Sequence, residues 1–161
     1  MSGGAPGPTR PAVVIERVSD LSPDCVAPLV ADSERAGLRL VRRLATEWTS
    51  GENRFDRPGE ALFVAIQAQR VIGVCGLNVD PYTPAPGVGR VRHLYVLTSC
   101  RRLGVGRRLV EAVVTAATGR FDVLRLRTNN PAAARLYEAI GFEPRTGEAD
   151  CTHRLTLTAP P

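Results

Sequence analysis

Residues 93–106 read HLYVLTSCRRLGVG, and this stretch joins a predicted strand, about residues 90–97, to a helix that begins at Gly104. Glycines at such a junction let successive backbone N–H groups point into one concavity at the positive end of the helix. Arginines at 101, 102, 107 and 108 add fixed positive charge suited to phosphate oxygens. We interpret the turn as a phosphate or pyrophosphate site. The alternative is a tight turn with solvated arginines, and neither the dinucleotide G-x-G-x-x-G pattern nor a Walker loop is present.

On the C-terminal side of this stretch the segments are clearly delimited. Residues 122–128 (DVLRLRT) alternate between leucine and arginine, which predicts a strand with one apolar face. A helix follows, with Asn130 as its N-cap, Pro131 at its first position and Gly141 at its end. Residues 151–157 (CTHRLTL) predict a last strand.

On the N-terminal side two helices and three strands are predicted. A strand at 12–18 precedes a helix from Pro23 to about Ala31, and a second helix follows from the apolar spacing of residues 38–48. A polar loop at 49–60 leads into a hairpin, and a Pro-rich loop spans 80–89. The two hairpin strands are 61–68 and 71–79. The order β, α, α, β, β, β, α, β, α, β predicts one α/β domain with a mixed sheet over 12–158, after a leader at 1–11 and before a tail at 159–161.

Composition narrows the classes of function. The 161 residues are 43% hydrophobic and 23% charged, with no apolar run of the ~20 residues that span a bilayer, so we expect no membrane partner. Four cysteines without a C-x-x-C pair favour reduced thiols, no metal and a cytoplasmic location. The net charge of +5 could attract nucleic acid. Aromatic residues make up only 5%, and the arginines gather at one junction, so we expect no nucleic-acid partner.

Two motifs resemble those of one superfamily. The segment 93–106 looks like motif A of the GNAT superfamily of N-acetyltransferases, a strand followed by R/Q-x-x-G-x-G/A that opens a helix. The segment 130–142, NPAAARLYEAIGF, resembles its motif B, N-x-x-A-x-x-L-Y-x-x-x-G-F. The resemblance covers roughly residues 12–158. It implies an α/β GNAT fold, with a mixed twisted sheet of about six to seven strands splayed between the fourth and fifth and flanked by about four helices.

The resemblance also implies a co-substrate and a role for each motif position. Acetyl-CoA would lie against the splayed strand, with its pantetheine amides on the backbone and its thioester carbonyl near the Val96 N–H. The segment from Arg102 to Arg107 would hold the pyrophosphate, and Tyr137 would protonate the departing thiolate as general acid. Without the resemblance Tyr137 would be a core aromatic and Asn130 only a cap. The coenzyme-binding residues implied are Leu94, Tyr95, Val96, Arg101, Arg102, Leu103, Gly104, Val105, Gly106, Arg107 and Asn130.

The resemblance implies direct attack by a neutral amine, which requires a proton acceptor. Three positions where relatives carry that base are arginines here, at 90, 92 and 125. Strict alternation puts Arg90, Arg92, Leu94 and Val96 on one face and Val91, His93 and Tyr95 on the other, so His93 is expected to be a core or surface histidine. The remaining candidates are Glu34, Glu47, Asp80 or an ordered water.

The function predicted is therefore acetyl-CoA-dependent transfer of an acetyl group to the primary amine of a small molecule or peptide. The alternative is a module of the same fold that binds acetyl-CoA or another acyl-CoA with little transfer. If arginines 90, 92 and 125 face the acceptor, the acceptor carries an acidic group; otherwise these arginines are solvated or pair with nearby carboxylates. A homodimer is compatible with the sequence.

Overall fold

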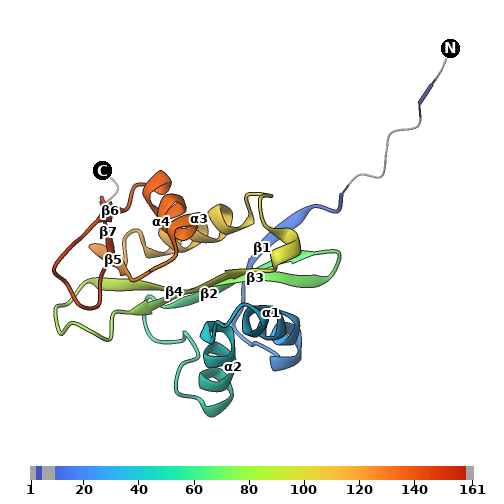
Figure 1. Ribbon diagram of the computed structural model, residues 1–161. Coiled ribbons are helices and arrows are strands. Elements are labelled where there is room, and N and C mark those ends of the chain that lie inside the picture. The colour runs from blue at the N-terminus through green and yellow to red at the C-terminus, as the bar shows by residue number, and fades with distance from the viewer. Residues whose placement is uncertain (1–2, 5–9, 159–161) are drawn as a thin grey trace.

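A seven-stranded sheet in the order β1-β2-β3-β4-β5-β7-β6 forms the middle layer of the molecule (Figure 1). The computed structural model describes residues 3–4 and 10–158, so most of the predicted leader and the predicted tail lie outside the described residues. Neighbouring strands are antiparallel except for β4 and β5, which run parallel. The predicted GNAT fold, with its mixed sheet and four helices, is confirmed.

The bounds of the elements follow the sequence prediction closely, apart from an unpredicted two-residue strand, β6. The strands are β1 Val13–Arg17, β2 Ala61–Gln67, β3 Arg70–Val79, β4 Val88–Val96, β5 Val123–Leu126, β6 Glu143–Pro144 and β7 His153–Thr156. The helices are α1 Pro23–Arg35, α2 Leu40–Ser50, α3 Val105–Ala117 and α4 Pro131–Ile140, with one 3-10 turn, η1 Thr98–Cys100. None of the helices in the described ranges is long and apolar enough to cross a bilayer.

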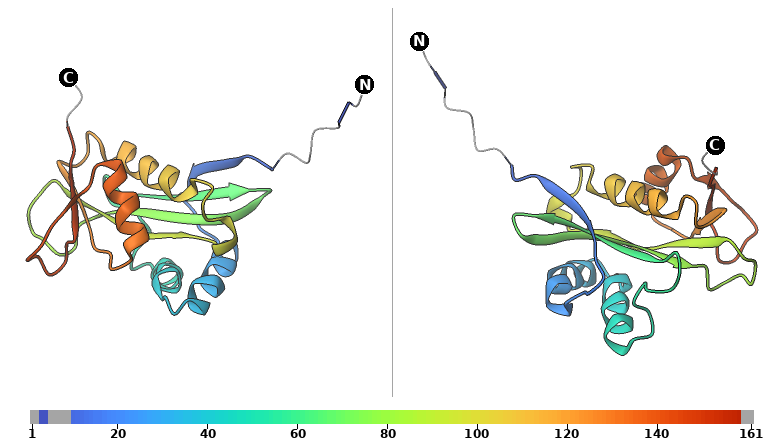
Figure 2. Two further views of the ribbon diagram at one scale, coloured as in Figure 1. Left: turned by 45° about the horizontal axis from the view of Figure 1, so that its top comes forward. Right: turned by 180° about the vertical axis from the view of Figure 1, so that it is seen from behind.

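Helices cover both faces of the sheet. α1 and α2 lie on one face, while α3 and α4 lie on the other (Figures 1 and 2). Apolar side chains from both helix pairs meet the sheet with no exposed surface, among them Leu29 and Leu44 on one side and Leu109 and Val113 on the other. Full burial of such a side chain stabilises the fold by about 1.5–3 kcal/mol. The sheet is therefore fixed from both faces, and the position of its strand ends is well defined.

Strands β4 and β5 separate part-way along the sheet. They pair at only three positions, Val88 with Val123, Gly89 with Leu124 and Arg90 with Arg125. β4 then continues for six residues to Val96, whereas β5 ends at Leu126. Beyond Arg90 the edge of β4 consequently faces the opening between the strands, as the family resemblance implied.

Candidate acyl-transfer site

The turn between β4 and α3 has the backbone that its glycines predicted. Gly104 adopts φ +74 immediately before the helix, and Arg102 adopts φ +69. A Cβ on Gly104 would meet no atom within 4 Å, so the space outside the helix start is open. No side chain in the described part of the chain caps α3, and its first turn carries no acidic residue. Its first N–H groups are thus free to bind an anion, which the helix dipole also favours.

Three of the four arginines around this turn are held by the protein itself. Arg101 donates from Nε to the Val96 carbonyl at 3.1 Å, and its guanidinium lies 5.3 Å from the centre of the Tyr95 ring. Arg107 pairs with Glu111 at 2.8 Å, and Arg108 donates to the β1 carbonyl of Val13 at 2.7 Å. Arg102 is exposed and has no partner among the described residues, so it is the arginine most available to a ligand there.

A β-bulge in β4 overturns the predicted alternation. Tyr95 pairs with Val74 and Arg92 with Gly76, so Cys75 lies opposite two residues, His93 and Leu94. His93 takes up the extra residue with φ +59. The prediction that His93 and Tyr95 share a face with Val91 is therefore wrong. Its companion prediction, that Leu94 and Val96 share the face of Arg90 and Arg92, is wrong for the same reason.

The side chains after the bulge follow a new pattern. His93 and Tyr95 point toward the α1–α2 face, where the His93 ring meets the edge of Phe55 and the Tyr95 hydroxyl reaches Asp32 of α1. Val96 points the other way, because a Cβ on Gly106 of α3 would lie 3.8 Å from it. Burial, reinforced by the charge of Arg92, lowers the pKa of His93 to about 4. The imidazole is therefore neutral at pH 7, and its Nε2 is buried without a hydrogen-bond partner in the described residues.

Asp32 connects α1 to the end of β4 through hydrogen bonds. Its Oδ2 accepts hydrogen bonds from the Tyr95 hydroxyl at 2.5 Å, the Thr98 N–H at 3.0 Å and the Thr98 hydroxyl at 2.9 Å. These hydrogen bonds, that of Tyr95 foremost, lower the pKa of Asp32 to about 2. The aspartate thereby fixes the residues that lead from β4 into the turn before α3.

Tyr137 lies on α4, on the opposite face from His93. The residue is 5% exposed and packs against Phe142 and His153, with ring centroids 5.5 and 6.3 Å away. Burial raises the pKa of Tyr137, so the phenol is protonated at neutral pH. Burial also raises the pKa of Cys75, the residue opposite the bulge, to about 12, which argues against a nucleophilic thiol there.

The remaining positions of the two motifs have clear structural roles. The Asn130 side chain caps α4 by accepting from the Ala132 N–H at 2.9 Å, and Gly141 ends the helix with φ +124, both as predicted. Gly106 lets α4 approach, because a Cβ there would lie 3.3 Å from Leu136. Val105 is 2% exposed, so only its backbone can face a ligand, whereas Leu103 is 40% exposed.

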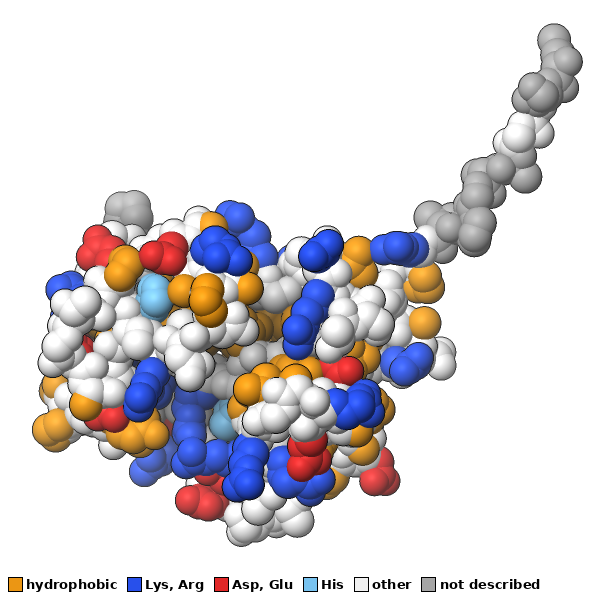
Figure 3. Space-filling model, viewed as in Figure 1, with side chains coloured by type: hydrophobic (Ala, Val, Ile, Leu, Met, Phe, Trp, Pro, Cys, Tyr) orange, Lys and Arg blue, Asp and Glu red, His pale blue; other side chains and the backbone are white. Residues whose placement is uncertain are grey.

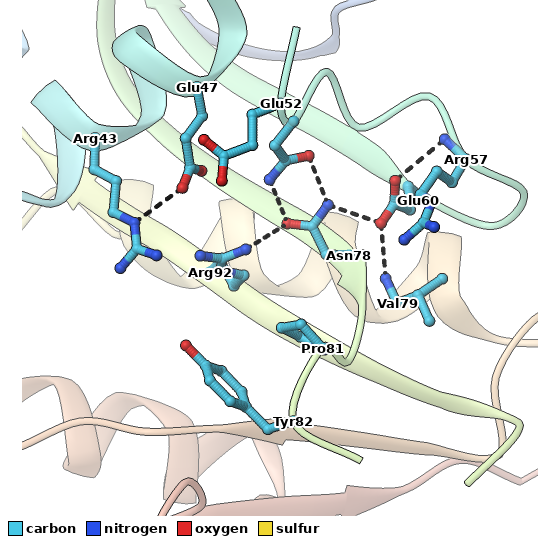
Figure 4. A pocket seen from close by; sticks show the side chains of 11 residues that line it. Arg43, Glu47, Glu52, Arg57, Glu60, Asn78, Val79, Pro81, Tyr82 and Arg92 are labelled. Carbon is cyan, nitrogen blue, oxygen red and sulfur yellow. Dashed lines mark hydrogen bonds and ion pairs between the residues drawn. The ribbon is translucent and has the colours of Figure 1, made fainter. Parts of the chain in front are cut away.

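A cavity of about 530 Å³ opens on the α1–α2 face of the sheet (Figure 4). Basic side chains gather along the middle of the molecule between the α1–α2 pair and the C-terminal strands (Figure 3). The cavity is bounded by α2, the loop after it, β3, β4 and the start of the Pro-rich loop. Its lining residues are Arg43, Glu47, Glu52, Asn53, Arg57, Glu60, Asn78, Val79, Pro81, Tyr82 and Arg92.

One side of the cavity is a fixed polar network. Asn53 and Asn78 exchange side-chain hydrogen bonds at 2.9 Å, and Asn78 also donates to Glu60 at 2.8 Å. Glu60 accepts further bonds from the backbone N–H groups of Val79 and Arg57. Sequence reasoning missed Glu60, since the loop at 49–60 carried no pattern that distinguishes it from other surface acids.

The predicted candidate bases fall in three different places. Glu34 is exposed on α1 and pairs with Arg42 at 2.6 Å, outside the cavity. Asp80 has a fully buried side chain held by two arginines. Glu47 alone lines the cavity, with its side chain 10% exposed.

The three arginines at the positions where relatives carry the base also differ in their surroundings. Arg90 and Arg125 each contact Asp80 at 3.4 Å; Arg125 also pairs with Glu148, and Arg90 stacks on Tyr82. For these two the alternative, pairing with nearby carboxylates, is the correct one. Only Arg92 lines the cavity, and its sole polar contact among the described residues is with Asn78 at 3.5 Å.

No group of three potential metal ligands occurs within residues 3–4 and 10–158. The polar groups of the described site are backbone N–H groups, arginines, carboxylates, side-chain amides, a neutral imidazole and phenols, of which those of Tyr95 and Tyr137 are buried.

Comparison with known proteins identifies the family. A profile described as the acetyltransferase (GNAT) domain matches residues 58–144. The crystal structure of a candidate acetyltransferase from Exiguobacterium sp. 255-15 is 32% identical over 90% of this chain and 93% of its own, with a TM-score of 0.78. The chain belongs to the GNAT acetyltransferase family. An acetyltransferase of the GNAT family from Staphylococcus aureus Mu50 is 17% identical over 91% of this chain and all of its own (TM-score 0.71) and supports the fold. So does the structure of a candidate acetyltransferase from Salmonella typhimurium with its cofactor acetyl-CoA, which is 17% identical over 91% of this chain and 95% of its own (TM-score 0.62).

The GNAT match covers only part of the site. Residues 58–144 include the splayed strand β4, the turn between β4 and α3, and α4 with Tyr137. They exclude α2, which supplies Arg43 and Glu47 to the cavity. Part of the cavity of this GNAT domain therefore comes from residues outside the segment that the family profile matches.

Proposed function

We propose that this GNAT protein transfers an acetyl group from acetyl-CoA to the primary amine of an acceptor by direct attack. The observation that carries the proposal is the splay of β4 from β5 after Arg90, at whose end the uncapped start of α3 presents its N–H groups. A backbone edge can pair with the pantetheine amides, and a helix start binds phosphate. The structural relative that holds acetyl-CoA supports the same donor.

Residues of the two motifs would hold acetyl-CoA. The backbone of Leu94–Val96 would pair with pantetheine, and the segment Arg101–Arg107 would hold the pyrophosphate. Asn130 would serve the coenzyme from the start of α4, in addition to its role as a cap. An N–H near Val96 would polarise the thioester carbonyl.

Tyr137 would act as the general acid. The amine nitrogen attacks the thioester carbonyl carbon, the carbon–sulfur bond breaks, and the leaving thiolate takes the phenolic proton. Because burial raises the pKa of Tyr137, the phenol carries its proton when the reaction begins. The inert, buried Cys75 supports direct attack over a covalent enzyme intermediate.

Thermal shift and thiol release test the proposal together. Acetyl-CoA should raise the melting temperature, because a ligand that binds only the native state stabilises it. Free thiol should then form from acetyl-CoA in the presence of at least one amine of a panel. Stabilisation without thiol release would favour the acyl-CoA-binding module instead. Stabilisation by oligonucleotides and not by acetyl-CoA would refute both readings.

A matched variant separates specific binding from general stabilisation. Gly104→Asp places a carboxylate at the free N–H groups of α3, at a position with open space and a φ that Asp tolerates better than most residues. The variant should fold and lose the shift with acetyl-CoA, because its charge repels the pyrophosphate. An unchanged shift would mean that the coenzyme does not bind at this turn.

A further inference from the structure

The three carboxylates that line the cavity differ in how many of their oxygens are already hydrogen-bonded. Both oxygens of Glu60 accept hydrogen bonds from Asn78 and from backbone N–H groups. Glu52 is exposed to solvent. Glu47 as a whole residue is 7% exposed. Its Oε1 accepts a hydrogen bond from Arg43 Nε at 3.0 Å, while its Oε2 is buried and has no hydrogen-bond partner in the described residues.

An uncommitted buried carboxylate oxygen points to a ligand. Leaving a buried acceptor unsatisfied costs about 1–3 kcal/mol, and more when it is charged. An ammonium group offers three donors and a positive charge, so it would satisfy Oε2 better than a neutral group. In Figure 4 the Glu47 carboxylate points into the space between Arg43 and Arg92.

The arginines of the cavity differ in the same respect. Arg43 is bound to Glu47, and Arg57 is exposed. Arg92 is half-buried, and its contact with Asn78 at 3.5 Å is too long for a strong hydrogen bond. Among the arginines that line the cavity, Arg92 alone is partly shielded from solvent and yet has no carboxylate partner in the described ranges. Arg90 and Arg125, on the same face of the sheet, are both paired with Asp80.

The cavity also lies where the reaction would occur. Arg92 is two residues past the last pair between β4 and β5, and the bulge at His93 comes next. Tyr137 lies on the other face of the sheet from the cavity, near enough to Cys75, the residue opposite the bulge, for that thiol to contribute to its raised pKa. The splay thus brings the acceptor cavity and the general acid to one point of the sheet.

We propose that the acceptor of this enzyme is a small amino acid-like molecule, whose ammonium binds Glu47 Oε2 and whose acidic group binds Arg92. This rests on the proposed acetyl transfer. The volume of about 530 Å³ suits a small molecule. Val79, Pro81 and Tyr82 form the less polar wall and would contact its side chain.

Glu47 also supplies the missing proton acceptor. The ammonium gives one proton to Oε2, and the resulting amine attacks the thioester. The nitrogen loses a second proton to solvent as the amide forms, and Tyr137, having protonated the thiolate, takes one proton back from solvent. The balance is one amide, one thiol and one proton released to solvent by way of Glu47.

The experiment compares three matched kinds of acceptor with three variants. The acceptors are α-amino acids, their carboxamides and simple amines of similar size, each tested with saturating acetyl-CoA. Glu47→Gln should lower kcat/KM at pH 7 by about 10²–10⁴-fold, the usual contribution of a general base. Arg92→Gln should reduce the preference for acids over carboxamides by about 10–100-fold, the value of a charge-assisted hydrogen bond. Glu34→Gln, on an exposed ion pair outside the cavity, is the control.

A pH profile distinguishes a base from a structural residue. Glu47→Gln should regain rate as the pH rises toward the pKa of the acceptor's ammonium, because solution then supplies neutral amine. Glu47→Asp should retain part of the rate at pH 7. A merely structural loss would leave the profile unchanged in shape.

Three results would overturn the inference: equal activity of Glu47→Gln and Glu34→Gln, equal use of acids and carboxamides by the unmodified protein, or a Glu47→Gln defect that no pH relieves. In each of these cases acetyl-CoA would still stabilise the protein and release thiol. Failure of stabilisation and release themselves would instead refute the acetyl-transfer proposal on which the inference rests.

Discussion

The buried ion cluster at Asp80 offers a sharp test of how the cavity face is held. The Asp80 side chain is fully buried, and its Oδ2 lies 3.4 Å from both Arg90 Nη1 and Arg125 Nη1. Its Oδ1 accepts the Tyr82 N–H at 2.7 Å, which fixes the start of the Pro-rich loop. Asp80→Asn keeps the volume and that hydrogen bond while it removes the charge.

The expected loss follows from the charges left behind. At an effective dielectric constant of about 20, each contact at 3.4 Å corresponds to about 5 kcal/mol of Coulomb attraction, much of it offset by desolvation. Arg125 keeps Glu148 at 3.2 Å, whereas the Arg90 side chain, 8% exposed, keeps no carboxylate among the described residues. Removing one partner of a buried pair costs about 3–5 kcal/mol, and we expect about 3 kcal/mol here.

Urea unfolding and thermal melts measure this loss. At roughly 2–4 °C per kcal/mol for a chain of this size, Asp80→Asn should melt about 6–12 °C lower. Adding Arg90→Met should recover most of the loss, since it removes the unpaired cation. Glu34→Gln should change little, because its partner Arg42 is exposed. A loss under about 1 kcal/mol, or no recovery in the double variant, would refute the electrostatic argument.

Three further predictions follow from the site. Tyr137→Phe should fold normally and still be stabilised by acetyl-CoA, since the phenol has no hydrogen-bond partner among the described residues, yet its kcat should fall by about 10²–10⁴-fold in thiol-release assays; an unchanged kcat would exclude it as the acid. Asp32 has its pKa lowered to about 2, so the stability it supplies is complete above about pH 4 and lost as the pH falls toward 2. Acid unfolding of Asp32→Asn should lack that loss, and a profile parallel to the unmodified protein would contradict the assignment. His93 has its pKa lowered to about 4 against about 6.5 when unfolded, so the unfolded state takes the proton first and stability falls between about pH 6.5 and 4. Urea unfolding at pH 7 and 5 should show this decline in the unmodified protein and not in His93→Asn, which tolerates the positive φ.

Several elements were predictable because local chemistry alone determines them. Asn130, Pro131 and Gly141 define α4 without help from the rest of the molecule, and the glycine turn before α3 requires its curled backbone in any fold. The β2–β3 hairpin was predicted from its flanking strands, although its turn is unusual. Ala68 and Gln69 both adopt positive φ with no glycine or asparagine at either position.

Other features depend on contacts between distant segments, and no local pattern reveals them. The ladder of β6 has two residues and exists only because β7 lies beside it. The clustering of Arg90 and Arg125 on Asp80 requires that β4, β5 and the Pro-rich loop meet. Glu47 looks like any other acid on a helix until α2 is placed over the sheet. Sequence could therefore predict residues for the coenzyme side of the site, which two motifs encode, but not the cavity on the other side, which five segments assemble.

The bulge at His93 is where these two sides of the site become linked. Alternation along a strand assumes an unbroken ladder, and one extra residue reverses the face of every side chain after it. A positive φ at a residue other than glycine costs about 1–3 kcal/mol. The Tyr95–Asp32 hydrogen bond and the contact of His93 with Phe55 form only in the reversed register and offset that cost. The same reversal leaves Leu94 and Val96 on the α3–α4 face and puts His93 beside Arg92 on the cavity face. The strand that would hold acetyl-CoA thus presents Arg92 to the cavity before the bulge and Leu94 and Val96 to the opposite face after it, through a single departure from regular backbone.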